Sequence, residues 1–377
     1  MTAVNECNES RQFPMTCPRL KVWQVAAVIG ISTLSLIAFP SLWKRAEEFA
    51  PEPSYRTPYA LSEDYWLYRR LCERTSDEQS VLMIGDSVIW GEYVSPSDAL
   101  SAQLNQKLGH NRFVNGGING LHPMAIEGML KMHGSQIQNL NVVVHCNLLW
   151  MSSPERDLSS TSPQQFNHAS LVRQFGGWPN PAKPESPAYD ETLSNRIAVA
   201  TARRLPYRIC VDHLRRRFFD GQNVHQWSLD HPAELFWNNV SFDMAQPSEE
   251  LRHEPVDWTQ QRIQPQSFDW VNLDDSLQFK SFVRAIELLK SRGNRVVVVL
   301  GPFNQHLLLA DNTEAFDALH ESAIARLTER KIPFVAMSLL PSSEYGDASH
   351  PLAQGYARMA DELLANVEFQ SVLTAAK

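Results

Sequence analysis

Three residues in the chain have the types and spacing needed to transfer an acyl group through a serine ester. Ser87 stands just after an apolar run, and Asp347 and His350 lie three residues apart near the C-terminus. A serine hydroxyl is a weak nucleophile until a neighbouring base takes its proton. Histidine is the side chain that titrates near neutral pH, and a carboxylate can hold its ring in the required tautomer. These residues therefore predict a Ser-His-Asp triad.

Donors for an oxyanion are also present. The tetrahedral intermediate of acyl transfer carries a negative oxygen, and each preplaced donor contributes roughly 3 kcal/mol to its stabilisation. The N–H groups of Ser87 and Gly117 and the side-chain amide of Asn147 are suitable donors. Trp90 and Trp150 follow Ser87 and Asn147 by three residues each. We expect both rings to flank the substrate pocket, with packing in the core as the alternative.

Alternating strands and helices must bring these residues together. Continuous apolar and β-branched runs predict strands buried on both faces of a parallel sheet. The predicted strands are 81–85, 113–117, 141–146, 295–301 and 333–340, and the predicted helices are 95–109, 123–137, 273–292, 313–331 and 351–366. The alternation indicates a doubly wound α/β domain, whose sites form at the carboxyl ends of the strands.

The same blocks resemble the GDSL/SGNH hydrolase superfamily. The matching residues are Ser87 in VLMIGDS, Gly117 in NGGING, Asn147 in VVVHCN, and Asp347 with His350 in GDASHP. The resemblance covers about 80–150 and 271–366. It implies a flavodoxin-like three-layer α/β/α sandwich, a Ser-His-Asp triad, and activity as an esterase, lipase, thioesterase or acyltransferase. The chain departs from the family pattern at Val88, where the family has leucine, and at Leu148, where an acidic residue usually follows the asparagine.

An apolar segment near the N-terminus predicts a membrane anchor. Residues 22–43 carry no charge, with Trp23 and Trp43 at the ends and basic residues on both sides. A helix of that length, at about 1.5 Å per residue, would cross the hydrocarbon core of a bilayer. We expect a single-pass helix, with a cleaved signal peptide as the alternative. Basic residues on both sides leave the orientation open.

The remaining organisation follows from composition. We expect a tail at 1–21, a span at 22–43, a linker and lead-in at 44–79, a hydrolase-like domain at 80–366 with an insertion at 151–270, and a tail at 367–377. The insertion contains a predicted helix at 191–219 and is rich in tryptophan, with Trp178, Trp227, Trp237, Trp258 and Trp270. A basic stretch at 203–217 is typical of a solvated helical face, with contact to anionic lipid or glycan as the alternative.

Charge and composition exclude several classes. Lys and Arg number 34 against 42 for Asp and Glu, a net charge of -8, which argues against a general nucleic-acid binder. The five cysteines form no C-x-x-C pair, and no H-x-x-x-H or H-E-x-x-H spacing occurs. These absences argue against a disulfide scaffold and a metal site, and no cofactor is expected.

These features predict a membrane-anchored serine esterase or acyltransferase that acts on O-acyl esters of an envelope carbohydrate, with acetyl as one candidate acyl group. The basis for placing the catalytic domain outside the cytoplasm is the layout of similar families, in which a span precedes an SGNH domain. The Trp-rich insertion could stack on sugar rings. One alternative is a lipid or small-ester hydrolase or thioesterase with the insertion as a lid. Another is a non-enzymatic glycan-binding or assembly protein. Hydrolysis versus transfer and the oligomeric state stay open.

Overall fold

A parallel sheet forms the centre of the protein. The computed structural model describes residues 21–162, 168–176, 181–189, 191–203, 205–247, 251–371 and 373. Its strands are β1 (Val81–Gly85), β2 (Phe113–Gly117), β3 (Asn141–Cys146), β4 (Arg295–Leu300) and β5 (Phe334–Ala336). They form one sheet in the order β2-β1-β3-β4-β5, and every pair is parallel. The predicted α/β class and parallel sheet are confirmed.

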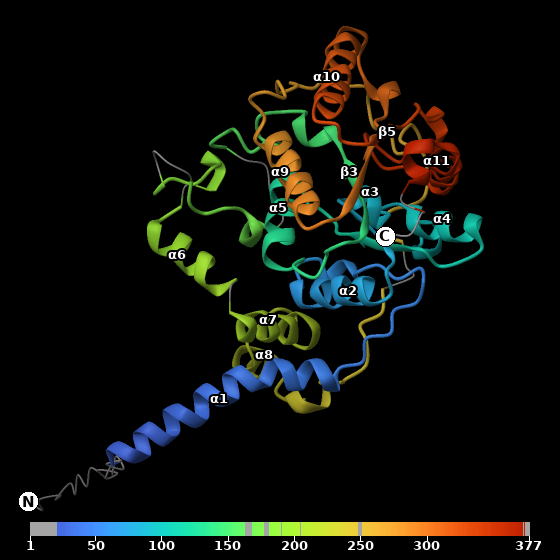
Figure 1. Ribbon diagram of the computed structural model, residues 1–377. Helices are drawn as coiled ribbons and strands as arrows, with labels where there is room; N and C mark the ends of the chain where they lie inside the picture. Colours follow the sequence, from blue (N-terminus) through green and yellow to red (C-terminus); the bar gives the residue numbers. More distant parts are fainter. Residues whose placement is uncertain are drawn as a thin grey trace, which may run out of the picture.

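Helices cover both faces of the sheet (Figure 1). Helices α5 (Pro123–Met132) and α9 (Leu277–Ser291) pack against each other on one face, and α4 (Leu100–Leu108) and α11 (Ala353–Ala365) pack against each other on the other. Helix α10 (Ala310–Glu329) connects β4 to β5. The strand residues between the layers are almost all buried, as the continuous apolar runs predict.

Three predicted elements are clearly shorter than expected. The predicted helix at 123–137 ends at Met132. The predicted helix at 95–109 is a 3₁₀ turn (Pro96–Asp98) followed by α4, with Ala99 extended between them. The Ser95 hydroxyl bonds the Asp98 side chain at 2.6 Å and makes no hydrogen bond to the helix backbone, so the capping signal serves the turn. The predicted strand at 333–340 ends at Ala336, which pairs with Leu300, the last residue of β4, so that no partner strand continues beyond it.

The apolar N-terminal segment forms one long helix, α1 (Val22–Ala46). Among the described residues it is the one helix long and apolar enough to cross a membrane. The following segment is more ordered than the predicted linker, because it contains helix α2 (Tyr65–Asp77) and a buried arginine, Arg56. The Arg56 guanidinium lies 3.9 Å from the ring centroid of Trp90 and donates to Gly91 O at 2.5 Å. The predicted linker is therefore part of the folded domain.

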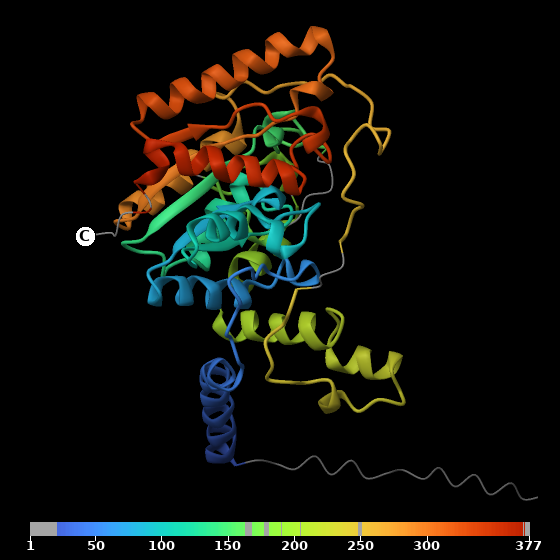
Figure 2. The same ribbon diagram turned by 90° about the vertical axis from the view of Figure 1, so that its right-hand side faces the viewer.

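The described residues of the insertion form three α-helices rather than one, α6 (Leu193–Ala202), α7 (Pro206–Phe218) and α8 (Val224–Asp230). The predicted helix at 191–219 breaks before Pro206, because a proline pushes the preceding residue out of the α region; Leu205 has φ -90° and ψ 113°. Helix α7 lies beside the C-terminal part of α1 in both views (Figures 1 and 2). The predicted C-terminal tail is also partly folded, since α12 (Val367–Gln370) buries Phe369 against Phe113.

A buried charge network ties α1 to the rest of the protein. Glu47, directly after α1, accepts hydrogen bonds from His213 Nε2 at 2.8 Å and from Arg217 Nη1 at 2.6 Å. The other ring nitrogen of His213 bonds Asp64 at 2.6 Å. Burial alone would lower the pKa of His213, but the carboxylates of Asp64 and Glu47 raise it to about 9. The basic stretch on α7 is therefore partly internal, since Arg216 also pairs with Glu63.

Candidate active site

The site lies at the carboxyl ends of β1 and β3. These strands are neighbours, but from them the sheet grows in opposite directions, which opens a crevice at their carboxyl ends. Ser87 follows β1 and begins the short helix α3 (Ser87–Trp90), and Asn147 follows β3. The loop after β5 carries Asp347 and His350 to the same place.

The turn before Ser87 depends on a glycine and a carboxylate. A Cβ on Gly85 would lie 2.4 Å from Ile89 Cγ1 and 2.9 Å from His145 Cβ, so only glycine fits there. Asp86 caps α3 by accepting a 3.1 Å hydrogen bond from the Val88 N–H. Together they fix where the Ser87 hydroxyl points.

The three predicted catalytic residues form a connected triad. Ser87 Oγ lies 2.7 Å from His350 Nε2. His350 Nδ1 lies 2.8 Å from both carboxylate oxygens of Asp347. The distances place the base within reach of the nucleophile and the carboxylate behind the base, which is the arrangement that activates a serine.

Backbone contacts hold the loop that carries the base. Asp347 Oδ1 accepts hydrogen bonds from the N–H groups of Ser349 at 2.9 Å and His350 at 3.0 Å. Asn304, after β4, donates from its backbone to Ala348 O at 2.9 Å and from its side chain to Asp347 O at 3.0 Å. The triad is thus pre-organised by the neighbouring strand ends.

Burial and charge act in opposite directions on the triad. Burial would lower the pKa of His350, but the carboxylates of Asp347, Asp86 and Glu92 raise it to about 9. Burial would raise the pKa of Asp347, but the charge and hydrogen bond of His350 lower it. The resting dyad is therefore an ion pair at neutral pH, and His350 must lose its proton to act as a base.

Asp86 connects the nucleophile turn to the rest of the site. Its Oδ2 accepts hydrogen bonds from Asn147 Nδ2 at 2.7 Å and from Trp150 Nε1 at 2.8 Å. Its Oδ1 lies 3.3 Å from the buried ring nitrogen Nδ1 of His145. Burial would raise the pKa of Asp86, but His145 and Asn147 lower it to about 2. Asp86 is thus a buried anion that orients three side chains around Ser87.

The structure corrects one predicted oxyanion donor. The Gly117 N–H bonds Asn115 Oδ1 at 3.0 Å, and a Cβ on Gly117 would lie 2.4 Å from Trp90 N, so this glycine packs against α3 and does not line the pocket. Gly120, three residues later in the same loop, lines the pocket with φ 71°. Among the described residues, no hydrogen-bond acceptor is within reach of the N–H of Gly120 or of Ser87.

The predicted flanking tryptophans differ. Trp150 lines the pocket beside Asn147. Trp90 is buried, donates from Nε1 to Thr57 O at 2.7 Å and does not line the pocket, so its predicted flanking role is wrong. Asn147 lines the pocket as predicted, but its Nδ2 already donates to Asp86 and, over a longer 3.3 Å, to Ser349 Oγ.

The triad opens into a cavity of about 370 Å³. Its walls include side chains that sequence reasoning missed, among them Glu92, Tyr93, Arg156 and His253. Glu92 bonds His253 at 3.0 Å and also pairs with Arg252, so the end of the insertion forms one wall. These residues belong to loops without a motif, and only the folded chain brings them to the site.

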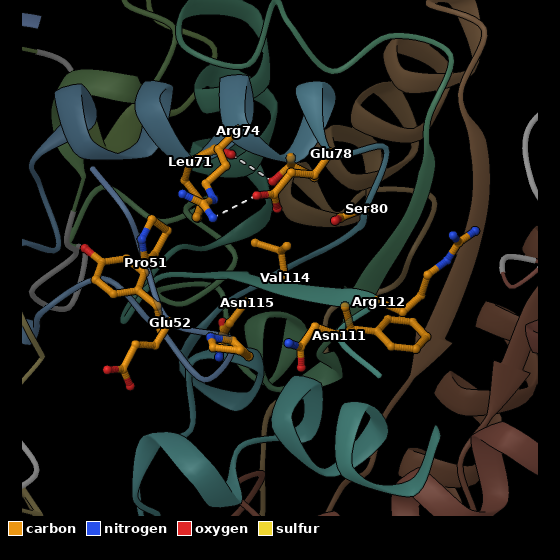
Figure 3. A pocket seen from close by; sticks show the side chains of 14 residues that line it. Pro51, Glu52, Leu71, Arg74, Glu78, Ser80, Asn111, Arg112, Val114 and Asn115 are labelled. Carbon is orange, nitrogen blue, oxygen red and sulfur yellow. Dashed lines mark hydrogen bonds and ion pairs between the residues drawn. The ribbon is translucent and has the colours of Figure 1, made fainter. Parts of the chain in front are cut away.

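A second cavity, of about 330 Å³, lies at the outer edge of β2 (Figure 3). Leu71 and Arg74 of α2 face Val114 of β2 across it, and Arg74 pairs at 2.8 Å with Glu78, which follows α2. Among the described residues that line it there is no histidine or cysteine. The cavity therefore offers no histidine to activate a serine, and the triad pocket is the better candidate for acyl transfer.

Comparison with known proteins adds no assignment. No family model matches the chain, and no curated protein matches it. The geometry of the site is therefore the basis for the proposed function.

Proposed function

We propose that the protein is an SGNH-type serine esterase or acyltransferase. The observation that carries the proposal is the 2.7 Å contact between Ser87 Oγ and His350 Nε2, with Asp347 at 2.8 Å behind the ring. A serine, a histidine and a carboxylate held in this order at the edge of a pocket favour acyl transfer over a merely structural arrangement.

In the proposed mechanism His350, once neutral, takes the proton of Ser87 as Oγ attacks the acyl carbon. The negative oxygen of the tetrahedral intermediate accepts hydrogen bonds from the N–H groups of Ser87 and Gly120. Gly120 thus takes the role that the sequence assigned to Gly117. The amide of Asn147 can join them by exchanging its 3.3 Å contact with Ser349 for the oxyanion. His350 then protonates the leaving alcohol, and an acyl group stays on Ser87.

The acyl-enzyme is released when His350 deprotonates water or a second alcohol. Water gives hydrolysis, and a sugar hydroxyl gives transfer. The proposed substrate remains an O-acyl ester of an envelope carbohydrate. The insertion supports this less than expected: Trp227 and Trp258 are buried, Trp270 packs partly against the core, and Trp178 lies outside the described residues. Of the described insertion tryptophans, only Trp237 is well exposed.

The proposed setting is a membrane surface, with α1 as an uncleaved single-pass anchor and the catalytic domain outside the cytoplasm. Pro40 and Trp43, at the C-terminal part of α1, are buried, and Trp43 packs in a cluster with Trp66, Ile209 and Cys210. Cleavage near this point would remove apolar groups from a folded core. The packing therefore supports an anchor over a signal peptide.

A substrate panel tests the proposal. The full chain in detergent is incubated with an O-acetylated polysaccharide and with a phospholipid, and released acetate and fatty acid are measured. Acetate release that is lost in Ser87→Ala supports the carbohydrate esterase, and fatty-acid release that is lost in the same variant supports the lipid hydrolase. Tight polysaccharide binding without turnover of either substrate contradicts an enzymatic role.

A further inference from the structure

Arg156 is an unpaired cation in the wall of the triad pocket. It is half-buried, and it follows the 3₁₀ turn that begins after Asn147. Its guanidinium makes one hydrogen bond, from Nη1 to Ser152 Oγ at 3.1 Å. Among the described residues no carboxylate lies within ion-pair distance of it. An arginine side chain has five N–H donors, so most of its hydrogen-bonding capacity is unused.

The other charged groups of the pocket have partners. Asp347 faces His350, Glu92 pairs with His253, and Asp86 accepts from Asn147. Burial lowers the pKa of Arg156, although the charge of Asp347, which lies beyond ion-pair distance, acts to raise it. Burying a charge without a directly bonded partner costs free energy. Such a cation in a substrate pocket is stabilised when a ligand supplies the missing anion, and the planar fork of arginine fits a carboxylate in a bidentate manner.

We propose that Arg156 is an anion subsite, which binds a carboxylate carried by the ester substrate next to the bond that Ser87 attacks. This inference rests on the proposed acyl-transfer function and adds the substrate class: an acidic ester. The carboxylate could belong to the alcohol part, as in an acidic sugar, or to the acyl part, as in a dicarboxylic half-ester. Both present the same group to Arg156.

Matched esters separate the two sources. On the alcohol side, 3-carboxyphenyl acetate is compared with the neutral 3-carbamoylphenyl acetate. On the acyl side, 4-nitrophenyl hydrogen succinate is compared with its methyl ester. With Arg156→Gln, kcat/KM should fall about 10–100-fold for the preferred carboxylate ester and by less than about threefold for its neutral partner, because a charge-assisted contact is lost. Arg208→Gln, on the exposed surface of α7, is the control and should change neither.

Binding to Ser87→Ala separates a failed subsite from a failed function. Calorimetry measures the affinity of 3-carboxyphenyl acetate and of 4-nitrophenyl hydrogen succinate for two proteins, the Ser87→Ala variant and the double variant Ser87→Ala/Arg156→Gln. Loss of carboxylate binding with the arginine supports the subsite, even if the wild type turns over no ester. Two results overturn the subsite without contradicting acyl transfer. In one, Arg156→Gln lowers kcat/KM equally for charged and neutral esters. In the other, carboxylate binding to Ser87→Ala is unchanged by Arg156→Gln.

A separate observation concerns the insertion. Eight large apolar side chains between residues 205 and 242 are exposed, and two of them, Val224 and Leu229, belong to α8. The other six are 37–57% exposed, and we refer to them as the apolar patch: Leu205, Tyr207, Leu235, Phe236, Trp237 and Phe242. Exposed apolar side chains that gather in one part of a protein mark a contact with another phase or another molecule. Its position relative to α1 indicates which one.

Two members of the apolar patch, Tyr207 and Phe242, adjoin the end of the candidate membrane span. The ring centroids of Tyr207 and Phe39 are 6.4 Å apart, and those of Phe242 and Trp43 are 5.1 Å apart. Figures 1 and 2 both show α7 and the segment after α8 beside the C-terminal part of α1. Phe39 and Trp43 belong to the uncharged stretch of the span. Residues that contact them therefore lie at the boundary of any membrane that α1 crosses.

We infer that the apolar patch lies in the lipid–water interface beside α1, so that the insertion contacts the membrane surface. Aromatic rings such as Tyr207 and Trp237 favour this layer. Contact with lipid explains why these side chains are exposed in the protein alone. The same contact holds the pocket at a fixed distance from the bilayer.

Site-specific photocrosslinking in the full chain tests this position. The chain is placed in phosphatidylcholine/phosphatidylglycerol vesicles with p-benzoylphenylalanine at one site: Trp237 in the patch, Ile29 in the middle of α1, or Leu339 outside the insertion. Lipid adducts at positions 237 and 29, but not at 339, support the inference. Lipid adducts at position 29 together with none at position 237, or with adducts at 237 to protein alone, overturn the interfacial position of the patch but support the anchor. Absence of lipid adducts at both positions overturns both.

Discussion

The side-chain amide of Asn147 donates a 2.7 Å hydrogen bond to Asp86, the residue directly before Ser87. The carboxylate thereby couples the carboxyl ends of β1 and β3. The same oxygen of Asp86 also accepts a hydrogen bond from Trp150 at 2.8 Å, which strengthens this connection. Asp86 is therefore a positioning residue, which acts on the reaction through the side chains that it holds.

Asp86→Asn tests this coupling. An asparagine can still cap α3, but its amide group cannot accept from both Asn147 and Trp150. Because small displacements of reacting groups are costly, kcat should fall about 10–100-fold with little change in KM. Asp361→Asn, at an exposed position on α11, is the control and should leave kcat unchanged. An Asp86→Asn enzyme with normal kcat would show that the coupling has no catalytic role.

Substitution of Gly117, at the end of β2, and of Gly120, in the loop after it, should affect stability and activity differently. Gly117→Ala places a Cβ 2.4 Å from Trp90 N, so overpacking should cost about 1–3 kcal/mol in the free energy of unfolding. Gly120→Ala acts at a positive φ of 71° beside the pocket and should lower kcat more than stability. Thermal unfolding and kcat are measured for both variants. The reverse pattern would restore Gly117 as the oxyanion donor.

Activity should rise with pH up to about 9. His350 acts as a base only when neutral, and its pKa is raised to about 9 by Asp347 and the neighbouring carboxylates. The sequence alone predicted a titration near ~6.5, the usual value for histidine. Asp347→Asn removes the largest raising charge, so the midpoint of the kcat/KM profile should move down towards that value. A wild-type midpoint below pH 7 contradicts this electrostatic account.

Stability should fall as the pH rises from about 6.5 to about 9. The pKa of His213 is raised to about 9 in the folded protein. Its stabilising contribution is therefore fully present below the unfolded pKa of about 6.5 and is lost as the pH passes through the folded value. His213→Gln should lower the melting temperature more at pH 6 than at pH 9.5. His225→Gln, on the exposed face of α8, is the control; equal losses at both pH values would contradict the pairing with Glu47 and Asp64.

The sequence predicted the sheet well because buried parallel strands are continuous apolar runs between turn signals. It also predicted the triad, since Ser87, Asp347 and His350 follow strand ends that any parallel sheet brings together. It misassigned Gly117, because two glycines of one loop look alike until a Cβ is placed against α3. It missed Arg156, because the signal there is a charge without a partner, which exists only in the folded chain.

The most direct test of the account is covalent labelling of Ser87. A fluorophosphonate reacts with an activated serine, and mass spectrometry of the digested protein locates the adduct. The account predicts one adduct, on the peptide that contains Ser87, formed faster as the pH rises towards 9 and absent in Ser87→Ala and His350→Ala. Labelling at another serine, or an unlabelled wild-type Ser87 in folded protein, would contradict it.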